Sequence, residues 1–236
     1  MQIIPLINSN ETSSIKASSM NGMIEQIRQA PISLVLSGLA LVLFVVPALG
    51  SHLEFRFKDF LWLDLSQDLG QHHQPLPSLA HWQVIFRIFG CNWLHWSANH
   101  LFWDTLMFFA ISRLCERQGR TTFLGTTIAS ATLIPPIVMI TTPELASYRG
   151  LSGIDTALFA LLAMTRLLTE IRRQQWIRSL VFLVLLFGMA AKIAYEMTAH
   201  QTLFVSDTSF TPVPIAHLTG AAIGIIGAVI ASRNDR

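Results

Sequence analysis

The sequence has few charged residues. Asp, Glu, Lys and Arg make up only 13% of the 236 residues, against about 25% in a typical soluble chain. The net charge at pH 7 is only +2, which argues against the basic surface of a nucleic-acid-binding protein. Hydrophobic residues make up 52% of the chain. We therefore expect an all-α protein embedded in a lipid bilayer.

Six segments are candidates to cross a bilayer, for which about 20 apolar residues are needed. They cover residues 32–49, 97–114, 121–140, 151–168, 177–194 and 214–231. Residues 1–30 are polar, which predicts a loosely ordered N-terminal tail. Residues 31–236 then form one membrane domain without internal repeats. We expect residues 50–95 to form a long outer loop with short helices at the membrane surface, because Trp62, Trp82 and Trp93 lie there and Trp favours the headgroup zone.

The positions of Lys and Arg predict the orientation of these spans, because cytoplasmic loops carry an excess of both residues. Basic residues of the expected cytoplasmic side are Lys16, Arg28, Arg113, Arg117, Arg120, Arg172, Arg173, Arg178, Arg233 and Arg236. Six spans with both termini in the cytoplasm satisfy this distribution. Cys91 then lies on the outer side and Cys115 on the inner side, so the two cysteines should not pair.

The first span has a competing interpretation. It ends in Ala48-Leu49-Gly50, which is compatible with a signal-peptide core and a small-residue cleavage site. The preceding tail is long for a signal peptide, and the apolar run is long enough to span. We therefore favour a retained span.

Polar side chains from three spans are expected at one depth. Ser152 lies at the outer end of the fourth span, and His217 lies about one turn into the sixth. His95 precedes the second span, while His100 and Asp104 lie one and two turns into it and share one face. Ionisable groups inside a membrane are costly, so each is a functional hypothesis. A serine needs a neighbouring base to become a nucleophile, and the neutral imidazole of His217 suits that role.

Glycines explain how these helices can approach closely. Gly150 and Gly153 flank Ser152, and Gly220-x-x-x-Gly224 follows His217. Small residues at this spacing allow helix backbones to touch. Each pattern alone is more typical of packing than of catalysis. Their coincidence at one depth favours a nucleophile–base pair.

Four patterns carry a family resemblance over roughly residues 80 to 232. They are Gly150-Leu151-Ser152-Gly153, Ala216-His217-x-x-Gly220-x-x-x-Gly224, His95-x-x-x-x-His100-x-x-x-Asp104, and the pair Arg87 and Glu116. In this order and spacing, the sequence resembles the rhomboid family of intramembrane serine proteases. The resemblance implies a rhomboid-like bundle of six transmembrane helices, whose site opens to the periplasmic side of a bacterial inner membrane.

The resemblance also implies roles for individual residues. Ser152 would attack the scissile carbonyl, and His217 would move its proton. The oxyanion hole would be lined or supported by the backbone N–H of Ser152 together with His100, Asp104, Gly150 and Gly153. Structural roles would fall to Arg87, His95, Glu116, Gly220 and Gly224. Substrates would be single-span membrane proteins cut near the outer face, and neither a metal nor an organic cofactor would be needed.

A narrower resemblance is to rhombosortases, six-span bacterial rhomboids thought to process proteins with a C-terminal tag. The tag consists of a glycine-rich motif, an apolar span and a basic tail. Lys192, Tyr195-Glu196 and the segment Pro212-Val213-Pro214-Ile215-Ala216-His217-Leu218 are similar to that subgroup.

Two positions depart from the rhomboid pattern. Asp104 stands where Asn is usual, and an ionised carboxylate would repel an oxyanion. Asp104 must then be protonated to serve there, or else it pairs with His100 and tunes the charge of that residue. One turn below the serine, where an aromatic residue or His is usual, the chain has Thr156 beside Asp155. We hypothesise that Asp155 or Thr156 orients the His217 ring.

Two other functions compete with proteolysis. The first is a rhomboid-like protein that keeps the fold and binds membrane clients without cutting them. In this sequence, Asp104 would be the residue that disables catalysis. A small proton-coupled transporter could use Asp104, Asp155 and the histidines as a relay. Transporters often have paired halves with internal symmetry, and the sequence has none.

Overall fold

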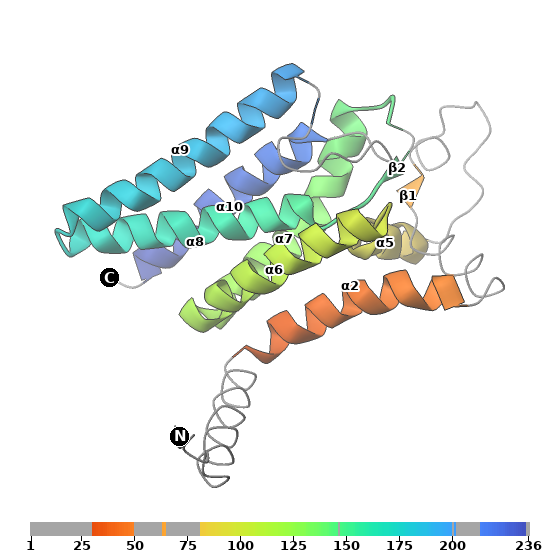
Figure 1. The fold of residues 1–236 in the computed structure, drawn as a ribbon, viewed down its shortest axis with the longest axis horizontal. Helices are drawn as coiled ribbons and strands as arrows, with labels where there is room; N and C mark the ends of the chain where they lie inside the picture. Colours follow the sequence, from red (N-terminus) through yellow and green to blue (C-terminus); the bar gives the residue numbers. More distant parts are fainter. Residues whose placement is uncertain are drawn as a thin grey trace, which may run out of the picture.

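The computed structural model describes residues 30–49, 63–64, 81–145, 147–199, 201 and 213–234. The described chain is mostly helical, and each predicted span coincides with a long helix (Figure 1). These helices are α2 (Pro31–Leu49), α6 (Ala98–Gln118), α7 (Arg120–Thr141), α8 (Ser152–Arg172), α9 (Trp176–Ala199) and α10 (Pro214–Asn234). The expected N-terminal tail, most of the long loop and the alternative cleavage site at Gly50 lie outside the described residues.

Three of the described helices, α7, α9 and α10, are long and apolar enough to cross a membrane. Large apolar side chains such as Trp176, Ile177 and Phe187 on α9 are well exposed. Such a surface is unfavourable in water but is what lipid tails solvate. The helical architecture is therefore that of an integral membrane protein.

Helix α8 lies at the centre of the described bundle, in contact with α6, α7, α9 and α10. Its buried side chains include Ile154 and Leu158, which belong to a core shared with Phe108 of α6 and Phe123 of α7. A central α8 places both of its ends, including the first residue Ser152, against several helices at once.

Helix α2 packs on α6 through polar contacts as well as apolar ones. The buried carboxylate of Glu116, near the end of α6, accepts from the backbone N–H of Ile32 at 3.2 Å and of Ser33 at 2.8 Å. It also accepts from the Ser33 hydroxyl at 2.7 Å. The first N–H groups of a helix have no intrahelical acceptor, so Glu116 caps α2 from a different helix.

The described part of the loop between α2 and α6 is tied to the bundle. It contains β1 (Leu63–Asp64), the short helix α5 (His81–Gly90) and the 3₁₀ turn η1 (Cys91–Trp93). β1 pairs antiparallel with β2 (Ser147–Tyr148), just before α8. Trp93 is buried within the protein, and its indole N–H donates to the Leu36 carbonyl of α2 at 3.3 Å.

The two cysteines are not paired. Cys91 and Cys115 are both free and buried, as expected from their predicted positions on opposite sides of the membrane. The Cys91 carbonyl accepts from the backbone N–H of Gly150 at 3.3 Å, which anchors η1 to the segment that leads into α8.

Candidate active site

Ser152 begins α8, directly after a sharp turn in the chain. Gly150 has φ of +123°, a conformation that only glycine adopts readily. A Cβ at this position would lie 3.0 Å from Cε1 of His100, 3.1 Å from its Nε2 and 3.3 Å from Oδ2 of Asp104. Both the turn and the close approach of α6 therefore require glycine immediately before Leu151-Ser152.

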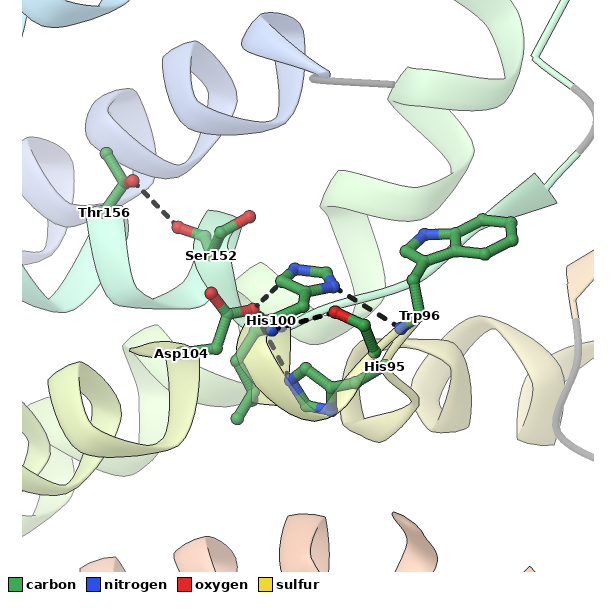
Figure 2. Close-up of polar contacts among 8 residues, drawn as sticks. His95, Trp96, His100, Asp104, Ser152 and Thr156 are labelled. Atoms are coloured by element: carbon green, nitrogen blue, oxygen red, sulfur yellow. Dashed lines mark hydrogen bonds and ion pairs between the residues drawn. The ribbon is translucent and has the colours of Figure 1, made fainter. Parts of the chain in front are cut away.

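Asp104 links α6 to the start of α8. Its Oδ2 accepts from the backbone N–H of Leu151 at 3.1 Å and lies 3.1 Å from Nε2 of His100 and 3.4 Å from Nε2 of His95. Figure 2 shows the two imidazoles and the carboxylate grouped beside Ser152. The N-terminal end of a helix favours a negative charge, so a carboxylate is well placed at this point.

The proton positions on His100 follow from its neighbours. The backbone N–H of Trp96 reaches Nδ1 of His100 at 3.5 Å, and an N–H can only donate. A neutral His100 therefore carries its proton on Nε2 and donates it to Asp104. His95 packs edge-on against the His100 ring, with ring centroids 5.1 Å apart.

Helix α10 touches the first turns of α8 through backbone atoms. A Cβ on Gly220 would collide with the carbonyl oxygen of Gly153, and one on Gly224 with that of Ala157. A Cβ on Gly153 would in turn lie 3.4 Å from the carbonyl oxygen of Ala216. The residues next to Ser152 on α8 and next to His217 on α10 are thus in contact, as the glycine spacing predicts.

His217 is buried and is held by a residue of α9. Its Nδ1 lies 2.8 Å from Oε2 of Glu196, and Oε1 of Glu196 lies 2.7 Å from Nζ of Lys192. Glu196 is only 1% exposed. In the sequence, Lys192 and Glu196 belong to a subgroup resemblance that implies no role for them; their i, i+4 spacing on a largely apolar helix was the available signal.

Asp155 and Thr156 were the hypothesised partners of the His217 ring, but the carboxylate that meets Nδ1 of His217 belongs to Glu196. Thr156 donates its hydroxyl to the Ser152 carbonyl at 2.8 Å (Figure 2). Oδ1 of Asp155 is buried without a hydrogen-bond partner among the described residues. Both residues follow Ser152 on the same helix, whereas the carboxylate at Nδ1 comes from α9, which no local spacing connects to Ser152.

Two of the expected structural residues, Arg87 and Glu116, lie on α5 and α6. Arg87 lies half-buried on α5, the helix that precedes η1. Glu116 lies 3.6 Å from Nε of Arg120 in addition to capping α2. The contacts of Glu116 are with α2 and Arg120 and do not include Ser152 or His217.

Two loop residues border the start of α8. The guanidinium of Arg149 lies over the Trp96 ring, 3.7 Å from its centroid, and burial lowers the pKa of Arg149 to about 10. It stays charged at neutral pH, and the contact is a cation–π interaction. Burial also raises the pKa of the Tyr148 phenol well above its ordinary value, so Tyr148 is neutral.

No group of three or more His, Cys, Asp or Glu that could hold a metal occurs among the described residues.

A family model described as the Rhomboid domain matches residues 82–234, more than half of the chain. No curated protein matches the chain.

Proposed function

This chain belongs to the rhomboid family, and from that premise we propose that it is an intramembrane serine endopeptidase with Ser152 as nucleophile and His217 as general base. The observation that carries the proposal is the backbone contact between the first turns of α8 and α10. Gly153 meets Gly220, and the carbonyl of Ala216 lies beside Gly153. This contact brings together the helix turns that bear the two reactive side chains.

The reaction follows from the two side chains. Nδ1 of His217 faces a carboxylate, which only accepts, so the proton of the neutral ring lies on Nδ1 and Nε2 keeps its lone pair. Nε2 takes the Ser152 proton as Oγ bonds to the scissile carbonyl carbon. The imidazolium then returns that proton to the leaving amine, and water repeats the cycle to release the acyl group.

The oxyanion would form beside the N-terminus of α8, where backbone N–H groups are available as donors. Asp104 already accepts from Leu151 N–H and from Nε2 of His100. These contacts favour the interpretation that Asp104 pairs with the histidines and positions His100. They do not require Asp104 to donate to the oxyanion.

We place six spans in the membrane, with both termini in the cytoplasm. α7, α9 and α10 satisfy the length and hydropathy criteria, α6 and α8 pack against them, and α2 packs on α6. The contact between Glu116 and the start of α2 puts the end of α6 beside the beginning of α2. This is the arrangement expected when α2 starts on the side where α6 ends. Ser152 then faces the periplasm of a bacterial inner membrane.

The substrates proposed are single-span membrane proteins cut near the outer face. The rhombosortase-like residues Lys192, Tyr195 and Glu196 support a narrower class, namely proteins with a glycine-rich motif, an apolar span and a basic tail at the C-terminus. Two co-expressed reporters test this. One carries the complete tag, and its control has the glycines replaced by alanine. Cleavage of the first alone supports the narrower class.

One observation favours a second candidate function. The Asp104 carboxylate accepts from the backbone N–H of Leu151, the residue before Ser152. A fixed negative charge at this position would repel an oxyanion and so slow acylation of Ser152. A protein disabled in this way would bind single-span clients without cutting them. It would retain the reporter on purification and leave it whole.

A fluorophosphonate probe, which phosphonylates activated serines, separates the two functions. We expect labelling of the full chain in membranes, and its loss in both Ser152→Ala and His217→Ala. A properly folded wild-type chain that is not labelled, and does not cleave either reporter, would refute the protease.

A further inference from the structure

We propose that Glu196 is a positioning residue for His217 and that Lys192 holds Glu196 in place, so that the site works as a triad built from α8, α10 and α9. This inference rests on the proposed protease function and deepens it. It assigns a role to a buried ion pair that the dyad does not use.

Each oxygen of the Glu196 carboxylate has a partner. One oxygen lies 2.8 Å from Nδ1 of His217, and the other lies 2.7 Å from Nζ of Lys192. The Glu196 side chain is 1% exposed and that of Lys192 is 28% exposed. A buried carboxylate is costly unless it is paired and hydrogen-bonded. Here both requirements are met by one residue of the site and one residue of the same helix.

The geometry matches what a general base needs. The carboxylate fixes the tautomer with the proton on Nδ1, which leaves Nε2 free to accept. It also fixes the plane of the ring, because the bond to α9 restrains rotation about the His217 side chain. When His217 takes the Ser152 proton, the new positive charge lies 2.8 Å from the carboxylate rather than alone in a medium of low dielectric constant.

Lys192 has a separate part in this arrangement. It lies one turn before Glu196 on α9, the spacing at which side chains meet. Its ammonium balances the charge of Glu196 and holds one oxygen, while the other meets His217. Ile193, beside Lys192, packs with Ala160 of α8 and Ala221 of α10, which fixes this turn of α9 against the two catalytic helices.

The test uses the purified full chain in detergent micelles and the fluorophosphonate probe, with the labelling rate measured against probe concentration. This yields the maximal rate, kinact, and the half-saturating concentration, KI. We expect Glu196→Gln to lower kinact by about 100-fold or more, with KI little changed. Glu196→Asp retains the charge and should label faster than Glu196→Gln. If Glu196 served only in packing, the isosteric Glu196→Gln variant would instead label faster than Glu196→Asp.

Glu170 provides a matched control. It is also a buried glutamate with a basic neighbour, Arg178 at 3.9 Å, but it lies near the opposite end of α8 from Ser152. Glu170→Gln should leave kinact unchanged, and thermal unfolding of each variant reports whether the fold survives.

The outcomes separate this inference from the proposed function. If the wild type labels at Ser152 and a folded Glu196→Gln protein labels with the same kinact, the triad is refuted and the dyad stands. If the wild type shows no labelling that depends on Ser152, both ideas fail. If Glu196→Gln and Glu170→Gln lose kinact equally, the effect is general to buried glutamates and the positioning role is refuted.

Discussion

Replacing Gly220 by Ala would insert one methyl group where α10 and α8 are in backbone contact. The new Cβ would collide with the carbonyl oxygen of Gly153 and lie 3.3 Å from the backbone N of Ala157. The obstructing atoms belong to the backbone, so no side-chain rotation makes room. The helices must separate, and we expect a shift of about 1 Å with a loss of about 1–3 kcal/mol in the free energy of unfolding.

The catalytic effect should exceed the effect on stability. Gly220 lies one turn after His217, and Gly153 directly follows Ser152, so the shift acts on the distance between nucleophile and base. A displacement of about 1 Å can cost about 100-fold in rate. We expect fluorophosphonate labelling of Gly220→Ala to slow by about that factor, measured in detergent at a temperature where the protein is still folded.

Glycines in open positions supply the control. A Cβ at Gly188 of α9 or Gly125 of α7 would meet nothing within 4 Å. Alanine at either position should leave labelling unchanged and stabilise the helix by up to about 1 kcal/mol. If Gly220→Ala labels at the wild-type rate and unfolds at the wild-type temperature, the contact between α8 and α10 does not set the catalytic geometry.

Three further substitutions test other parts of the site. Gly150→Ala should abolish labelling and cost about 1–3 kcal/mol, because φ is +123° there and the His100 and Asp104 side chains leave little space; normal labelling would contradict the tight turn. Glu116→Ala leaves the first N–H groups of α2 without their acceptor and should lower the free energy of unfolding by about 1–3 kcal/mol in thermal melts, whereas an unchanged melting temperature would argue against the cap. Asp104→Asn keeps an acceptor for Leu151 N–H and removes a negative charge beside Ser152. It should label at least as fast as wild type, and a loss of about tenfold or more would show that the carboxylate itself is needed.

Much of the architecture could be read from the sequence because it depends on local patterns. The apolar runs coincide with helices α2, α6, α7, α8, α9 and α10. The spacing of Gly220 and Gly224 marks one face of α10, since residues four apart lie on the same side of a helix. His100 and Asp104 share a face of α6 for the same reason, and their contact follows directly.

Contacts between helices could be predicted only where a motif marked them. The partner of His217 was sought at Asp155 and Thr156 because they lie one turn from Ser152 on the same helix. The carboxylate at Nδ1 belongs to Glu196, on α9. Likewise, no local pattern marks the partner of Trp93, whose buried indole donates to the Leu36 carbonyl of α2.

The sequence by itself determined which segments are helical, which glycines permit close packing, and that a serine and a histidine lie at the start of two such helices. These properties depend on apolar periodicity and on residues within one or two turns. Only the tertiary structure decided which carboxylate meets His217, what Asp104 holds and what caps α2. Each of these depends on the rotation and offset of one helix against another. Both follow from the packing of the whole bundle, and no local sequence pattern predicts them.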